Sequence, residues 1–135
     1  MQLGLSYKRY QLDIPPAVWA EFFDQLTEEN RGRLITLKLL DDQLGDFEVL
    51  RHTPLYGITY VAGGVARGAA GGDRPGGRGD LVVTVGRPQG LGEATYAHRV
   101  VCPQAVSIVT DEDGIVLSCT ITNRDQAQSK ISFQS

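Results

Sequence analysis

Hydrophobic positions in residues 13–30 recur with the period of an α-helix. The apolar side chains form one wide stripe, made of Ile14, Val18, Phe22 and Leu26 at four-residue spacing and the adjacent Trp19 and Phe23. The flanking residues fit the two ends of a helix: Asp13 as N-cap, Pro15 and Pro16 in the first turn, and Asn30 and Gly32 as the stop. The pattern predicts one amphipathic helix over residues 13–30.

From Arg33 onward, the pattern changes to short alternating runs separated by turn residues, which is typical of β-strands. Apolar side chains occupy both faces of residues 33–40, so we expect a strand buried on both sides, with the helix covering one. Asp113 and Gly114 form the strongest hairpin signal. The predicted strands are 33–40, 47–50, 56–62, 81–85, 95–101, 105–110 and 115–122, with a short last strand at Ile131 and Phe133.

These elements predict an α+β fold. We expect one N-terminal helix packed on a strongly bent antiparallel β-sheet or on a small, partly open barrel of the Sm-like or SH3-like kind. Residues 13–135 are predicted to be a single domain. Residues 62–79 hold eight of the 16 glycines and predict a surface loop. Residues 1–12 predict an edge strand or an N-terminal arm that could pack on a neighbouring subunit.

Composition narrows the choice of partners. The chain has 135 residues and a formal net charge of −3, which gives no long-range attraction for nucleic acid. No run approaches the roughly 18 apolar residues of a membrane span, and the first ten residues lack the pattern of a signal peptide. We therefore expect a cytoplasmic protein, with Cys102 and Cys119 reduced.

The chemically reactive side chains form no recognisable catalytic or metal motif. His52, His98, Cys102 and Cys119 are the residue types that zinc prefers, yet no closely spaced pair of them starts a site. The carboxylates cluster in turns, where they are usually solvated, and no serine lies in a nucleophile elbow. We assign no catalytic residue, metal or cofactor.

Four residues remain as possible contacts for a ligand or a partner. His98 could be a polar group at a barrel mouth, while Arg31 and Arg33 lie at the junction between the helix and the first strong strand. Tyr56 is an aromatic side chain in a predicted strand.

Several motifs resemble one known family. They are Trp19, Phe22 and Phe23 on the helix, the run Gly32–Thr36, Gly45, the run from Pro54 to Ile58, and the stretch from His98 to Pro103 ahead of Val106 and Ile108. Over residues 13–133, the chain resembles the domain of unknown function 5335 family of uncharacterised bacterial proteins, with residues 1–12 and 62–79 as additions. The resemblance implies no activity and no catalytic residue. The order of elements also resembles the Sm-like barrel.

Three functions stay open at this point. The first is a non-enzymatic binding or assembly module, forming a homo-oligomer through sheet edges or the N-terminal arm, because an exposed edge is a template for another strand. The second is an Sm-like RNA-binding protein, although the negative net charge disfavours nucleic acid as a partner. The third is a small-molecule or enzymatic site near His98.

Overall fold

The computed structural model describes residues 8–61, 79–86 and 95–134. In this part of the chain, one α-helix accompanies eight strands, in agreement with the predicted α+β class. The elements in chain order are β1 (Tyr10–Asp13), the 3₁₀ turn η1 (Pro16–Val18), α1 (Trp19–Asn30), β2 (Leu34–Asp41), β3 (Gly45–Val61), β4 (Asp80–Gly86), β5 (Thr95–Val100), β6 (Pro103–Thr110), β7 (Val116–Asn123) and β8 (Gln128–Phe133).

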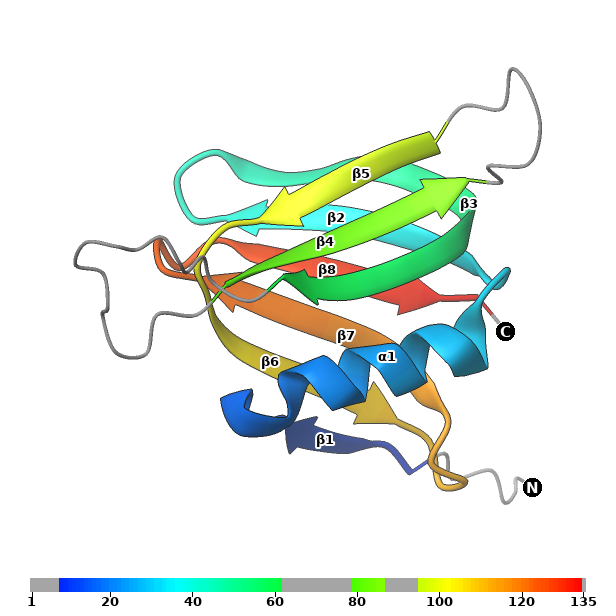
Figure 1. Cartoon of the computed structure of the whole chain (residues 1–135). Helices are drawn as coiled ribbons and strands as arrows, with labels where there is room; N and C mark the ends of the chain where they lie inside the picture. Colours follow the sequence, from blue (N-terminus) through cyan, green and yellow to red (C-terminus); the bar gives the residue numbers. More distant parts are fainter. Residues whose placement is uncertain (1–7, 62–78, 87–94, 135) are drawn as a thin grey trace, which may run out of the picture.

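All eight strands belong to one antiparallel sheet in the order β1-β6-β7-β8-β2-β3-β4-β5 (Figure 1). The sheet is strongly bent but not closed, so within the described residues β1 and β5 are its two end strands. The likeness to Sm-like or SH3-like barrels stays a prediction.

The bend of the sheet lies in β3. Two separate strands, 47–50 and 56–62, were expected here, but Gly45–Val61 is one continuous strand. Its first half pairs with β2 as far as Pro54, and its second half pairs with β4 from Leu55 onward. An extra β3 residue near His52, whose φ is 52°, shifts the register against β2. Such a bulge lets a strand turn without ending, which is why the proline does not break it.

The helix begins later than predicted. Residues 16–18 form a 3₁₀ turn and α1 starts at Trp19. Asp13 lies in β1, so its prediction as the N-cap is wrong, and Val18 occupies the N-cap position of α1 without a side-chain hydrogen bond. The buried stripe is centred on Trp19, Phe23 and Leu26.

The helix packs against β3 rather than over β2 (Figure 1). Ile35 and Leu37 on β2 are fully buried, whereas Leu34 and Lys38 on its other face are exposed. The expectation that this strand is buried on both sides is therefore wrong, because the helix covers a different strand.

The remaining predicted strands agree with the structure to within one or two residues, except that the last one is longer and spans Gln128–Phe133. Residues 1–7 and most of the predicted loop at 62–79 lie outside the described residues. Gly79 is described: it is buried, and its N–H donates to the Tyr60 hydroxyl at 2.8 Å. None of the described helical segments combines the length and the apolar composition that a bilayer crossing requires.

Candidate functional site

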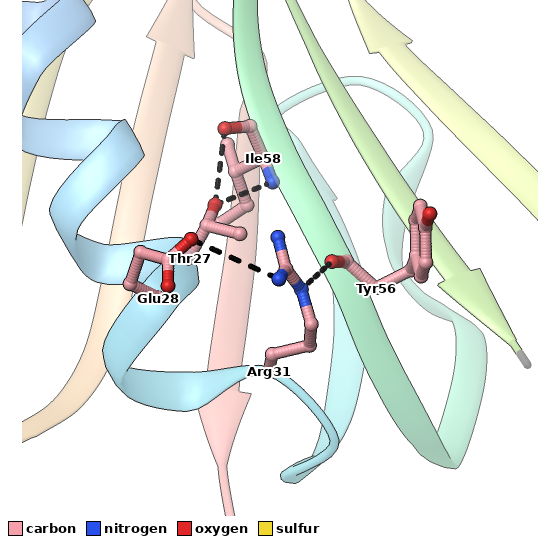
Figure 2. A network of polar contacts seen from close by, with 5 residues as sticks. All are labelled: Thr27, Glu28, Arg31, Tyr56 and Ile58. Atoms are coloured by element: carbon pink, nitrogen blue, oxygen red, sulfur yellow. Dashed lines mark hydrogen bonds and ion pairs between the residues drawn. The ribbon is translucent and has the colours of Figure 1, made fainter.

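Arg31 and Tyr56, two of the four predicted contact residues, lie together where α1 meets β3 (Figure 2). The Arg31 Nε donates to the Tyr56 carbonyl oxygen at 3.2 Å, and the guanidinium lies 5.8 Å from the centre of the Tyr56 ring. Glu28 forms an ion pair with Arg31 at 3.8 Å. Both charged side chains are largely exposed, so this ion pair adds little to stability.

The same junction holds a buried contact that sequence reasoning missed. The Thr27 hydroxyl accepts a hydrogen bond from the Ile58 N–H at 2.9 Å and donates to the Ile58 carbonyl oxygen at 3.2 Å (Figure 2). Beyond Leu55, β3 pairs with β4 on one side only, so its other edge needs partners for its backbone groups. Thr27 and Arg31 provide them. The available signal was a threonine on the buried face of an amphipathic helix.

Arg33 is close to Arg31 in sequence but makes different contacts. Its guanidinium donates to the Gln134 carbonyl oxygen at 2.8 Å, to Asn30 Oδ1 at 2.8 Å and to the Val116 carbonyl oxygen at 3.3 Å. It also stacks 5.1 Å from the centre of the Phe133 ring. These contacts join the end of α1 to β7 and β8, so the Arg33 side chain stabilises the fold.

His98 lies apart from this junction, on the end strand β5. It pairs with Val83 of β4, whose side chain is fully buried, so His98 is on the core-facing side of the sheet. Its ring Nε2 is 3.2 Å from the hydroxyl of Ser129 on β8. The bent sheet thus brings β5 back over β8, and this contact crosses the space between them.

Ser129 is the polar member of an otherwise apolar row across four neighbouring strands. It pairs with Ile121 of β7 and Leu39 of β2, and Leu39 in turn pairs with Phe47 of β3. Ser129 is buried, so its hydroxyl needs a partner, and His98 is that partner. Sequence reasoning did not single out Ser129, because the side-chain contact between β5 and β8 is not visible in local patterns.

A cavity of about 260 Å³ lies at this place. It is lined by residues 98–101 of β5 and the segment after it, by the β2–β3 hairpin, and by the β7–β8 turn. Leu44, Phe47 and Val101 at its border are large apolar side chains with much of their surface exposed, Leu44 the most at 74%. The cavity is therefore an open, mainly apolar groove.

The two charged side chains that line the groove, Asp41 and Arg99, already bind partners within the protein. Asp41 Oδ1 accepts hydrogen bonds from the N–H groups of Leu44 and Gln43, which lower the pKa of Asp41. Arg99 forms an ion pair with Asp80 at 2.6 Å. The groove thus offers neutral hydrogen-bonding groups rather than a free charge.

Burial lowers the pKa of His98, which favours the neutral imidazole. A neutral imidazole has one donor and one acceptor nitrogen, and the tautomer depends on its partners. Within the described residues, the Nδ1 of His98 and the side-chain Nδ2 of Asn123 make no hydrogen bond, and both residues line the groove.

The cysteines do not form a site. Cys102 and Cys119 are free thiols, and full burial raises the pKa of Cys119 to about 12, which makes its thiol inert. Cys102 lies at the bend between β5 and β6 with a φ of 52°. No group of three or more possible metal ligands is found among the described residues.

No family model, no curated protein and no solved structure matches this chain. The resemblance to the domain of unknown function 5335 family stays a prediction.

Proposed function

We propose that this protein is a non-enzymatic assembly module that associates with itself through the ends of its open sheet. One observation carries this proposal. Both end strands hold large apolar side chains on the core-facing side of the sheet, and these side chains stay about half exposed in the part of the chain that the structure describes. These side chains are Tyr10 at 48% and Leu12 at 49% on β1, and Tyr96 at 43% on β5.

Their orientation follows from the register. Tyr10 pairs with Thr110 and Leu12 with Ile108, and both β6 residues are buried. Tyr96 likewise pairs with the buried Val85. Completing the burial of side chains of this size stabilises a complex by about 1 kcal/mol each. An end strand also offers unpaired backbone groups, so a second strand can add there.

Sedimentation velocity between about 1 and 500 μM tests the proposal. We expect the wild-type chain to show a reversible, concentration-dependent mass above that of the monomer. Leu12→Ser or Tyr96→Ser should weaken association, depending on which end is used. Leu34→Ser is the matched control, since Leu34 is 37% exposed but lies on β2, between β8 and β3 in the interior of the sheet. A wild-type chain that stays monomeric throughout, or equal weakening by all three substitutions, contradicts the proposal.

A second candidate function is the binding of a small neutral molecule in the groove beside His98. It is favoured by the mainly apolar lining together with His98 Nδ1 and Asn123 Nδ2, which have no hydrogen-bond partner among the described residues and can bind a polar group of the ligand. At about 260 Å³ the cavity is slightly smaller than a typical drug-sized site, so a compact ligand fits best.

Titration with indole and with benzamide, followed by two-dimensional NMR, tests the groove. We expect saturable shifts confined to the β2–β3 hairpin, β5 and the β7–β8 turn, weakened by Asn123→Ala. Linear, unsaturated shifts over the whole surface contradict it. The RNA-binding alternative has less support, because Arg31 and Arg33 are used in contacts within the fold.

A further inference from the structure

The direction of the backbone groups in β1 decides how a second strand could add to it. The Ile14 N–H donates to the Val106 carbonyl oxygen at 2.8 Å and so points toward β6. Backbone groups alternate in direction along a strand, so those of Leu12 and Tyr10 also point toward β6. The N–H and C=O groups of Gln11 and Asp13 therefore point away from β6, to the open edge.

The residues around Gln11 form a self-complementary sequence. Arg9 and Asp13 lie two residues before and after Gln11, and Tyr10 and Leu12 lie one residue before and after it. An antiparallel strand related by a two-fold axis at Gln11 places Arg9 opposite Asp13 of the second copy. The same register places Tyr10 opposite Leu12 of the second copy, and both pairs occur twice because the axis makes the interface symmetric.

We propose that β1 pairs with β1 of a second copy in this register, with Gln11 opposite Gln11. This inference rests on the proposed self-association and names its surface and geometry. Gln11 of each copy donates its N–H to the carbonyl oxygen of the other. The Arg9–Asp13 pairs continue the ladder in both directions, since their backbone groups have the same parity as those of Gln11.

The side chains support this register over its neighbours. Aromatic–aliphatic and opposite-charge pairs stabilise antiparallel strands when they lie directly opposite each other. An axis at Tyr10 would instead place Leu12 opposite the charged Lys8. An axis at Leu12 would place Arg9 opposite Pro15, which has no N–H to donate. Of these three, only the axis at Gln11 matches both the charged and the apolar side chains.

Pairing along so short a strand buries little surface, so the dimer is expected to be weak and reversible. Its dissociation should respond to charge reversal on the outer face of β1. Arg9→Asp places two aspartates opposite each other at each end of the pairing, and Asp13→Arg places two arginines there. We expect each variant alone to dimerise about tenfold less tightly than the wild type.

The decisive experiment mixes the two variants. In an equimolar mixture of Arg9→Asp and Asp13→Arg, both pairs are again of opposite charge, so a heterodimer should form with affinity close to the wild type. The double variant carrying both changes should also recover homodimerisation. Arg124→Asp and Asp125→Arg are matched controls, because they make the same charge changes in the exposed β7–β8 turn. They should leave the dimer unchanged.

The outcomes separate this inference from the proposal on which it rests. If the wild type is monomeric up to about 500 μM, both are wrong. If the wild type dimerises but the β1 variants match the turn variants, self-association stands and the β1 register is wrong. The register is equally refuted if mixing the two variants, or combining them in one chain, restores nothing. Melting temperatures of all variants identify any loss of dimer that is caused by unfolding.

Discussion

The double hydrogen bond of Thr27 is the contact whose removal should be most informative about the fold. Thr27→Val keeps the shape of the side chain and deletes the hydroxyl. Ile58 would then lose its acceptor at 2.9 Å and its donor at 3.2 Å, in a place where Thr27 itself is only 7% exposed. Water cannot easily replace these partners, so both backbone groups of Ile58 would stay unsatisfied.

The expected loss of stability follows from these two groups. Each hydrogen bond contributes about 1 kcal/mol, and a buried polar group left without a partner costs about 1–3 kcal/mol. We therefore expect Thr27→Val to lower the free energy of unfolding by about 2–4 kcal/mol. A domain of this size has a total of about 5–15 kcal/mol, so the effect is large.

Urea unfolding measures this change directly, and amide hydrogen exchange locates it. Exchange at Ile58 should accelerate more than at Val83, its partner on β4. Thr59→Val is the matched control, because Thr59 is exposed on the same strand, and it should change stability by less than about 0.5 kcal/mol. Equal effects of the two substitutions would refute the idea that the Thr27 hydroxyl takes the place of a neighbouring strand.

Three further predictions concern the core, the thiols and the buried histidine. Phe23→Ala should cost about 3–5 kcal/mol of stability and Phe22→Ala clearly less, because Phe23 is fully buried and Phe22 only partly; thermal melts compare them. Ellman's reagent should modify Cys102 but not Cys119 in the folded protein, whereas both should react in 6 M guanidinium. Equal labelling of the two thiols in the folded protein would contradict this prediction. Burial lowers the pKa of His98 below its unfolded value of 6.5, so the unfolded chain binds the proton more readily than the folded one. The contribution of neutral His98 to stability is therefore fully present above about pH 6.5 and is lost as the pH falls toward the folded pKa. Urea midpoints measured against pH should show this decline, and His98→Gln should make it less steep.

Local patterns predicted the elements of this fold well where one strong periodicity was present. The buried stripe of α1 and the strands after residue 80 follow from periods of 3.6 and 2. The errors occurred where a tertiary contact decides the outcome. Asp13 has the chemistry of an N-cap, yet its backbone pairs with Ser107 on β6. Pro54 looks like a strand breaker, yet a bulge before it lets β3 continue.

The candidate residues were predictable by type but not by role. Arg31, Arg33 and Tyr56 are polar or amphipathic side chains near a junction, and such side chains serve equally well in binding and in holding elements together. The structure assigns Arg31 and Arg33 to backbone partners in the fold. Of the four candidate residues, only His98 lines the groove, and its partner Ser129 lies 31 positions away, beyond the reach of any local pattern.

The way the helix protects β3 explains why the ends of the sheet are the better candidates for assembly. Where β3 leaves β2, the fold exposes an internal strand edge, and α1 covers it with Thr27 and Arg31 as substitute partners. Within the described residues no comparable cover lies along the open edge of β1, where Gln11 and Asp13 direct their backbone groups outward. A second copy of β1 would supply the same kind of partner at that end as α1 supplies along β3. The proposed dimer therefore gives hydrogen-bond partners to the backbone groups of the β1 edge, as α1 does for those of β3 within one chain.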